Sequence, residues 1–185
     1  MKALDNIEVA AAYVDGKAFE ITPGETILNF TKRTIGEKQV PTLCDDPRLK
    51  PYGACRVCSV EVALKADGPV KTIASCHTPV TAGMHVFTQT DSLQKLRKNI
   101  IELVISDHPL DCLTCEVNGN CQLQDVAADV GLRDVRYGNG DNHLSREKDS
   151  SHAYMRMDLA KCINCARCVR ACDEIQGSFV LGMEG

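Results

Sequence analysis

Alternating and helical patterns of apolar residues predict a small mixed domain at the start of the chain. Two apolar runs, Ile7–Val14 and Ala18–Ile21, are joined by Asp15-Gly16, a dipeptide that favours a tight hairpin turn. Thr26–Ile35 then carries apolar residues at helical spacing and stops at Gly36. Strand-like runs follow at Ser59–Leu64, Val70–Ala74 and Met84–Thr88. Two strands, a helix and further strands predict a β-grasp sheet.

The middle of the chain reads as helical. Asp91–Ser106 has the clearest helical pattern, with Asp91 or Ser92 as its cap and an end set by Pro109. Its predicted apolar stripe is Leu93, Leu96, Ile100, Leu103 and Val104, and its predicted outward residues are Lys95, Arg97 and Lys98. A second, shorter helix is predicted at Gln122–Gly131, with Leu123, Val126 and Val130 turned inward.

The last quarter of the chain is more polar. Residues 133–151 are rich in Gly, Asp, Asn and Ser, with Gly138–Asn142 at their centre, and this composition is typical of a linker or surface loop. Tyr154–Asp158 then reads as a short strand. We therefore expect an α+β protein with a β-grasp domain at 1–90, a helical domain at 91–132, a linker at 133–153 and a small incomplete domain at 154–185.

Charge and length exclude several classes of function. The 185 residues carry a formal net charge of -4 and no run of basic residues, so we expect no nucleic-acid partner and no binding to an anionic membrane surface. Asp5 stands where a signal peptide would begin its apolar stretch, and no window approaches the ~20 apolar residues of a membrane-spanning helix. These patterns predict a soluble, cytoplasmic protein whose partners are other proteins.

The cysteine content points to metal or redox chemistry. Eleven cysteines are unusual in the reducing cytosol unless they bind metal or do redox chemistry, and an odd number argues against a disulfide framework. If His108 is counted as a ligand, eleven becomes twelve, which makes three consecutive sets of four with no cysteine left over.

The middle set is compact. His108, Cys112, Cys115 and Cys121 follow the spacing His-x3-Cys-x2-Cys-x5-Cys, which lets one loop surround a single metal centre. Structural zinc accepts one histidine and three cysteines, so zinc stays an alternative. The neighbouring cysteine sets favour a [4Fe–4S] cluster, in which imidazole in place of thiolate raises the reduction potential.

The first set is spread over a longer loop. Cys44, Cys55 and Cys58 are followed by a distant Cys76, which resembles the plant-type [2Fe–2S] order with a longer first gap. Gly53 and Ala54 precede the Cys55 pair, and small residues there let backbone N–H groups approach bridging sulfides. A four-cysteine zinc site is the alternative, although zinc sites more often use two CxxC pairs.

The third set is the bacterial-ferredoxin run CxxCxxCxxxC, formed by Cys162, Cys165, Cys168 and Cys172. In two-cluster ferredoxins the fourth cysteine of this run ligates the other cluster. The run therefore predicts a [4Fe–4S] cluster on Cys162, Cys165 and Cys168 whose fourth ligand lies elsewhere. Cys172 serves a further cluster or acts as a local fourth ligand, and we expect the chain to be part of a longer polypeptide.

Together the three sets resemble the N-terminal iron–sulfur region shared by the complex I large iron–sulfur subunit, NAD-linked hydrogenases and NAD-dependent formate dehydrogenase α subunits. Three short stretches resemble the formate dehydrogenase α subunits most: Ser151–Tyr154, Cys168–Gly177 and Asp111–Cys115. The resemblance implies one [2Fe–2S] and two [4Fe–4S] clusters, and it implies as partners a flavin/NAD-binding diaphorase subunit and a molybdenum or tungsten pterin catalytic domain.

The function expected from this resemblance is electron transfer within an oxidoreductase complex, with no substrate-binding catalytic site in this chain. The positive charges of Arg56, Arg167 and Arg170 are candidates for tuning the cluster potentials, against the alternative that they are solvated surface residues. Small iron–sulfur subunits of hydrogenases, complex I or related reductases remain alternatives. A zinc-stabilised scaffold without redox function and a cluster-bearing sensor are alternatives of other classes.

Overall fold

A two-residue turn fixes the first pair of strands. The computed structural model describes residues 10–137 and 147–183. Strands β1 (Ala11–Val14) and β2 (Lys17–Glu20) pair antiparallel, and the turn residues Asp15 and Gly16 have φ of 47° and 83°. A tight hairpin turn requires this left-handed conformation. The predicted hairpin is confirmed, apart from Ile7–Val9, which lie outside the described residues.

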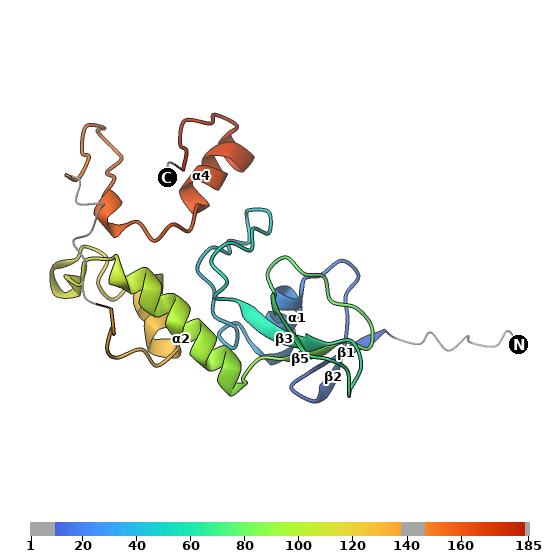
Figure 1. The fold of residues 1–185 in the computed structure, drawn as a ribbon. Coiled ribbons are helices and arrows are strands. Elements are labelled where there is room, and N and C mark those ends of the chain that lie inside the picture. Colours follow the sequence, from blue (N-terminus) through green and yellow to red (C-terminus); the bar gives the residue numbers. More distant parts are fainter. Residues whose placement is uncertain (1–9, 138–146, 184–185) are drawn as a thin grey trace, which may run out of the picture. The chain divides into compact units, whose positions relative to one another are not determined.

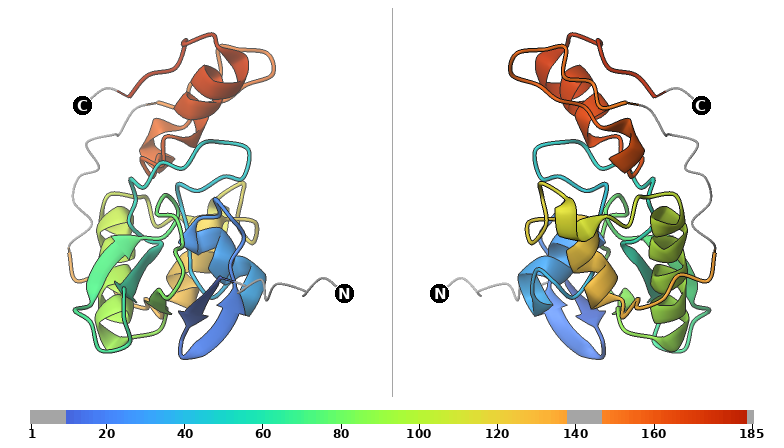
Figure 2. Two further views of the ribbon diagram at one scale, coloured as in Figure 1. Left: turned by 90° about the vertical axis from the view of Figure 1, so that its right-hand side faces the viewer. Right: turned by 90° about the vertical axis from the view of Figure 1, so that its left-hand side faces the viewer.

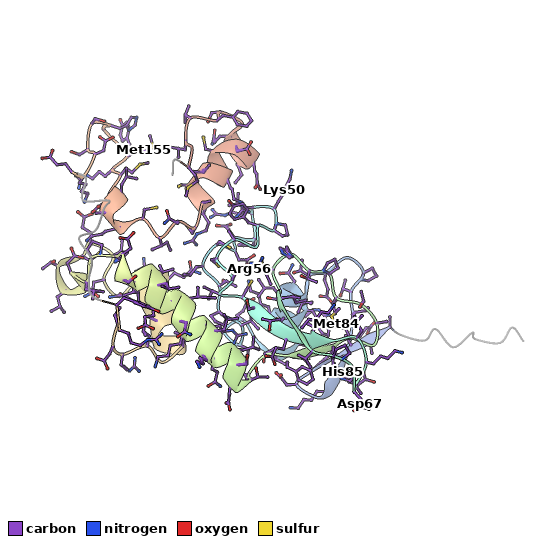
Figure 3. The ribbon with its side chains drawn as sticks, viewed as in Figure 1. Lys50, Arg56, Asp67, Met84, His85 and Met155 are labelled. Carbon is purple, nitrogen blue, oxygen red and sulfur yellow. The ribbon has the colours of Figure 1, made fainter. Side chains whose placement is uncertain are left out.

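Three further strands complete one five-stranded sheet. They are β3 (Ser59–Ala63), β4 (Lys71–Ala74) and β5 (His85–Phe87), and the strand order is β2-β1-β5-β3-β4. β5 pairs parallel with β1 and antiparallel with β3, and the rings of Tyr13 and His85 stack with centroids 4.3 Å apart. Figure 3 labels His85 in this part of the sheet. The three predicted runs are confirmed as slightly shorter strands, and the predicted α+β, β-grasp arrangement is observed.

Helix α1 (Ile27–Ile35) covers one face of this sheet (Figure 1, Figure 2). The Thr26 hydroxyl accepts a hydrogen bond from the Asn29 N–H at 3.2 Å, and Gly36 ends the helix with φ of 110°. Ile27, Leu28 and Phe30 are completely or almost completely buried against the strands. Burying side chains of this size contributes roughly 1.5–3 kcal/mol each.

The chain forms two compact units. The sheet unit comprises the described residues of Met1–Val40 with Cys58–Leu93, and the helical unit those of Pro41–Val57 with Gln94–Gly185. The segment 41–57, which follows α1 in sequence, therefore belongs to the helical unit. The functional domain bounds expected from the sequence remain predictions.

Helices α2 (Asp91–Ser106) and α3 (Gln122–Asp129) lie side by side in the helical unit (Figure 1, Figure 2). Their shared core contains Leu43, Val57, Ile101, Ile105, Leu123, Val126 and Leu132. Leu43 and Val57 flank the segment that carries the first two cysteines. Both helices agree with the sequence prediction, and Leu123 and Val126 point into the core as expected.

The buried face of α2 differs from the predicted stripe. Leu103 was predicted to face inward and is 56% exposed, whereas Arg97 was predicted to face outward and is 3% exposed. The buried positions repeat every four residues through Leu93, Arg97 and Ile101. The aliphatic part of an arginine side chain can occupy an apolar face. The spacing of apolar residues alone therefore placed the buried face of α2 on the wrong side of the helix. The cap also differs, because the Thr90 hydroxyl accepts from the Leu93 N–H at 3.2 Å.

Short helical turns make up the last described segment. They are η2 (Leu159–Lys161), α4 (Arg167–Ala171) and the π-helical turn η3 (Cys172–Gln176). The predicted strand at Tyr154–Asp158 is wrong, because only Met157 makes an isolated bridge, with Asp149. The predicted linker centre, Gly138–Asn142, lies outside the described residues. In the described part of the chain, no helix is long and apolar enough to cross a membrane.

Candidate metal centres

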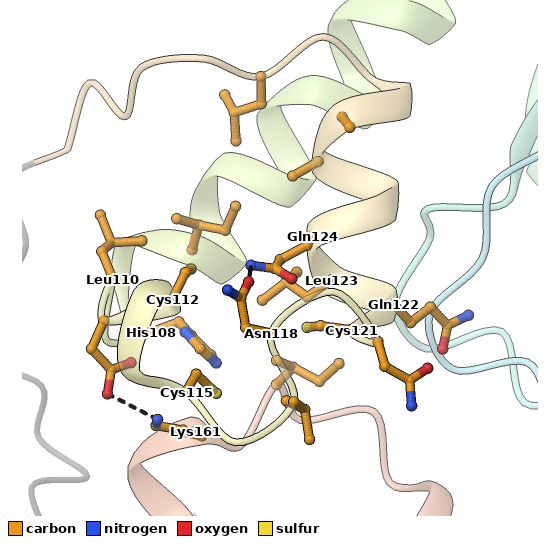
Figure 4. Close-up of a pocket in the computed structure, with 18 of the residues that line it drawn as sticks. His108, Leu110, Cys112, Cys115, Asn118, Cys121, Gln122, Leu123, Gln124 and Lys161 are labelled. Atoms are coloured by element: carbon orange, nitrogen blue, oxygen red, sulfur yellow. Dashed lines mark hydrogen bonds and ion pairs between the residues drawn. The ribbon is translucent and has the colours of Figure 1, made fainter.

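The four residues of the middle set line one cavity. His108, Cys112, Cys115 and Cys121 surround a space of about 470 Å³ in the helical unit (Figure 4). His108 lies just after α2, Cys112 begins the turn η1 (Cys112–Thr114), and Cys115 ends that turn. Cys121 directly precedes α3. The ends of two packed helices and the loop between them therefore bring all four predicted ligands to one place.

His108 is oriented for ligation by its other ring nitrogen. Its Nδ1 lies 2.8 Å from the carbonyl oxygen of Pro109, and because a carbonyl only accepts, Nδ1 carries the proton. Nε2 then keeps a free lone pair. A backbone carbonyl that fixes the tautomer in this way is a common arrangement behind metal-binding histidines.

Polar side chains brace the loop around the cavity. The Gln124 amide donates to Asn118 Oδ1 at 3.0 Å, and Gln124 Oε1 accepts from the Gly119 N–H at 3.2 Å. Lys161 Nζ lies 2.9 Å from Asp111 Oδ2 (Figure 4). The hydrogen bond to Asp111 raises the pKa of Lys161, and a second contact, with the Cys115 sulfur, acts in the same direction. Lys161 is thus a cation beside a predicted ligand, and no motif or spacing in the sequence singled it out.

The donors of the middle cavity are three thiols and one imidazole. A single zinc ion accepts this combination of ligands. Three soft thiolates with one imidazole are also donors that an iron–sulfur cluster accepts, and here they surround a cavity of about 470 Å³.

The first two cysteines of the first set lie together in the helical unit. The Cys55 thiol hydrogen-bonds the buried Cys44 sulfur, which lowers the pKa of Cys44 and raises the pKa of Cys55. The backbone N–H groups of Cys55 and Ala54 also face the Cys44 sulfur. Gly53, with φ of 71°, turns the chain just before them. The N–H group of Ala54 thus approaches a cysteine sulfur, while its approach to bridging sulfides stays a prediction.

The other two cysteines of this set lie in the sheet unit. Cys58 directly precedes β3 and Cys76 follows β4 by two residues, and both are part of the buried core. The hydroxyl of Ser75 donates to the Cys58 carbonyl oxygen at 2.7 Å. The pairing of β3 with β4 therefore fixes the backbone around both cysteines. Ligation of one cluster by Cys44, Cys55, Cys58 and Cys76 remains a prediction.

The third set lies on an irregular loop and a short helix. Cys162 ends η2, and Asn164 and Ala166 between the cysteines have φ of 53° and 55°. The Arg167 guanidinium donates to the Cys165 sulfur at 3.5 Å and to Gln122 Oε1 at 2.8 Å. Arg167 therefore contacts both a third-set cysteine and the residue after Cys121.

Cys168 and Cys172 face different surroundings. Cys168 is exposed and lines a second cavity, of about 350 Å³, together with Asp46, Arg48 and Arg167. Cys172 is buried, with its sulfur 3.2 Å from the Ser178 hydroxyl. That hydrogen bond, followed by backbone N–H groups of residues 179–181, lowers the pKa of Cys172. Ligation by the third set also remains a prediction.

Two family models match the chain. A model described as a 2Fe-2S iron-sulfur cluster binding domain matches residues 9–91, and one described as the NADH-ubiquinone oxidoreductase-G iron-sulfur binding region matches residues 97–136. The first span contains Cys44, Cys55, Cys58 and Cys76, and the second contains His108, Cys112, Cys115 and Cys121. The chain thus has a [2Fe–2S] binding domain followed by a [4Fe–4S] binding region.

Proteins of known name are similar to this chain along most of its length. The G subunit of NADH-quinone oxidoreductase from Rickettsia felis is 36% identical over 174 residues, and that from Rickettsia prowazekii is 35% identical. Each match covers 91% of this chain and 24% of the relative, so the chain spans about a quarter of the length of these proteins. A crystal structure of an NAD+-reducing [NiFe]-hydrogenase in the H2-reduced state matches 95% of this chain and 71% of that chain, with 28% identity and a TM-score of 0.79.

These similarities span both matched regions and nearly the whole fold. The family resemblance carried by the three ligand sets is therefore confirmed, while the closer likeness to formate dehydrogenase α subunits stays a prediction. The chain thus contains two matched iron–sulfur binding regions and is similar over most of its length to the NADH-quinone oxidoreductase G subunit and to an NAD+-reducing hydrogenase.

Proposed function

We propose that this chain relays single electrons between an NAD(H)/flavin-binding subunit and a catalytic centre. The cavity lined by His108, Cys112, Cys115 and Cys121 carries this proposal, because it gathers four predicted cluster ligands in one place. Further cysteine sets precede and follow it in the sequence. Three centres along one chain are what a stepwise electron path needs.

Each ligand set is assigned one cluster in this proposal. The [2Fe–2S] cluster takes Cys44, Cys55, Cys58 and Cys76, and the histidine-ligated [4Fe–4S] cluster takes the four residues of the middle cavity. A second [4Fe–4S] cluster takes Cys162, Cys165 and Cys168. Its fourth ligand is either Cys172 or a residue outside this chain, in which case Cys172 serves a further cluster.

The protein residues hold the clusters and adjust their charge. The bound clusters supply one-electron redox chemistry. Thiolates fix their position, the N–H groups of Ala54 and Cys55 donate towards the Cys44 sulfur, and Lys161 places a positive charge beside Cys115. The Pro109 carbonyl keeps the His108 Nε2 available as the ligand atom.

The complex in which the relay works is a finer proposal. The three stretches Ser151–Tyr154, Cys168–Gly177 and Asp111–Cys115 support an NAD-dependent formate dehydrogenase, with a molybdenum or tungsten pterin domain and a diaphorase subunit as partners. We infer a cytoplasmic location for this complex. The named relatives support the alternatives, a hydrogenase or a complex I-like reductase.

Metal and sulfide analysis of anaerobically purified protein tests the relay. About ten iron atoms per chain, the sum for one [2Fe–2S] and two [4Fe–4S] clusters, would support all three assignments. About six would leave the third set empty. Zinc without acid-labile sulfide would overturn the relay in favour of a structural scaffold.

The terminal substrate is tested on the complex isolated with its natural partners. Formate-dependent reduction of NAD+ together with molybdenum or tungsten in the preparation would support formate dehydrogenase. Hydrogen-dependent reduction with nickel present would select the hydrogenase alternative, and NADH-dependent quinone reduction would select the complex I-like alternative. The cluster signals should appear on reduction in all three cases, so they test the relay independently of the substrate.

A further inference from the structure

Arg170 ties the third-set helix to the loop of the first set. Although it is charged, Arg170 is only 7% exposed. Its Nη1 donates to the Cys44 carbonyl oxygen at 3.1 Å, and its Nη2 donates to the Lys50 carbonyl oxygen. Cys44 and Lys50 belong to the segment 44–55, named here the ligand loop because it begins and ends with a predicted ligand. Both contacts lie within the helical unit.

Two further contacts fix the guanidinium in this position. Arg170 Nε donates to Glu174 Oε1 at 3.2 Å, and Glu174 Oε2 accepts from the Lys50 N–H at 2.7 Å. The guanidinium also lies over the Tyr52 ring, 4.7 Å from its centroid. Figure 3 labels Lys50 on the ligand loop, next to the side chains of the α4 segment. A planar group that is bonded on several sides has one orientation.

The position of this charge has an electrostatic consequence at Cys44. Arginine stays protonated at every pH at which proteins fold, and a buried charge is screened less than a surface charge. Arg170 Nη1 lies 3.1 Å from the carbonyl oxygen of Cys44, so the charge is held next to the residue whose sulfur is the first predicted ligand. The Arg170 cation thus favours negative charge at this sulfur.

We propose that Arg170 is a positioning residue that raises the reduction potential of the [2Fe–2S] cluster by holding a fixed positive charge against the Cys44 end of the ligand loop. This inference rests on the proposed function, which assigns Cys44 and Cys55 to that cluster. Reduction adds one electron, and therefore one negative charge, to the cluster, and no bond forms or breaks. A nearby cation stabilises the reduced form more than the oxidised form.

Glu174 allows a test of the sign of the effect, because its charge is opposite to that of Arg170. Arg170→Met removes the cation, whereas Glu174→Gln keeps the cation and an acceptor oxygen but removes the compensating anion. The two variants should therefore shift the [2Fe–2S] potential in opposite directions. A purely structural clamp would be weakened by both changes and would give shifts of the same sign or none.

The experiment is a redox titration of the full chain with its clusters, followed by EPR. With Arg170→Met we expect the ratio of reduced to oxidised [2Fe–2S] cluster at a fixed solution potential to fall by about tenfold, which for one electron is about 59 mV. With Glu174→Gln the ratio should rise. Arg48→Met is the matched control, since Arg48 lies on the same loop, is 78% exposed and pairs with Asp46. It should change the ratio less than about twofold, and the histidine-ligated cluster should serve as an unchanged internal reference.

The outcomes separate this inference from the proposed function. If the unmodified protein shows no [2Fe–2S] signal on reduction, the proposed function fails. If the signal is present but Arg170→Met and Glu174→Gln both leave its potential unchanged, or both lower it, the tuning role is overturned. If Arg170→Met loses the cluster, two other variants are compared: Arg170→Lys, which keeps the charge, and Glu174→Gln. A rise in the ratio of reduced to oxidised [2Fe–2S] cluster with Glu174→Gln supports the inference. An unchanged ratio refutes it.

Discussion

Lys161 Nζ lies 2.9 Å from Asp111 Oδ2, so the residue before Cys162 is ion-paired with the residue before Cys112. The same ammonium contacts the Cys115 sulfur. One cation thus connects the start of the third ligand set to the loop of the middle set.

This cation should affect the middle cluster. Lys161→Met removes a positive charge next to Cys115, so the reduced cluster loses stabilisation and its potential should fall by an amount equivalent to several-fold in the reduced-to-oxidised ratio. Redox titration followed by EPR measures it. Lys95→Met, on the exposed side of α2, is the control. Equal potentials in the Lys161 variant and the control would refute a role for Lys161.

The imidazole of His108 should set the potential of the same cluster. His108→Cys adds a negatively charged ligand, so the cluster should persist with a lower potential. His108→Ala should lose or convert the cluster signal while the [2Fe–2S] signal stays. The EPR spectra of both variants test this. An unchanged spectrum and potential in a folded His108→Ala protein would exclude ligation by this residue.

The buried carboxylate of Glu102 should make stability depend on pH. Glu102 Oε2 lies 2.6 Å from Arg136 Nη2, and its side chain is 2% exposed. This hydrogen bond lowers the pKa of Glu102 below its ordinary value. The stabilisation is therefore complete above the ordinary glutamate pKa and is lost as the pH falls through the lowered native pKa.

Thermal unfolding of the unmodified protein and Glu102→Gln between neutral and acid pH tests this. We expect Tm of Glu102→Gln to be several degrees lower at neutral pH, with the gap closing in acid. Glu116→Gln, which removes an exposed pair with Lys148, should leave Tm nearly unchanged. A gap that widens on acidification would contradict the prediction.

Asp15 joins the hairpin turn to the end of β5. Its carboxylate accepts hydrogen bonds from the Thr88 N–H at 2.8 Å and the Thr88 hydroxyl at 2.6 Å. Asp15→Ala leaves both donors without this acceptor, and we expect a loss of about 2–3 kcal/mol in the free energy of unfolding. Denaturant unfolding measures it, with Asp15→Asn as the comparison, since one amide oxygen keeps part of the interaction. A loss below about 0.5 kcal/mol, the size of an ordinary surface change, would show that the contact is unimportant.

Local patterns predicted the local structure well. Asp15-Gly16 produced the hairpin because few dipeptides tolerate two successive residues with positive φ. Thr26 and Gly36 bounded α1 because caps act within one turn. The middle ligand set was also predictable, since His108 and Cys121 are close in sequence and the ends of α2 and α3 bring them to one cavity.

Relationships between distant segments were not predictable from local patterns. Arg97 is 3% exposed on the buried face of α2, and the spacing of apolar residues along one helix does not predict the burial of a charged side chain. Arg170 was only one of three candidate arginines in the sequence. Its burial against the ligand loop depends on residues more than a hundred positions away, and no short motif encodes such a contact.

Segment 41–57 is synthesised early, but it belongs to the helical unit, whose other residues, 94–185, are synthesised later. Arg170 and Cys44 are separated by 126 positions, so their contact cannot form until the ribosome has added those residues. At about 5–20 residues per second this takes about 6–25 s. The ligand loop, although it lies near the start of the chain, must wait through this interval for its clamp, while its thiols remain open to oxidants and to competing metal ions.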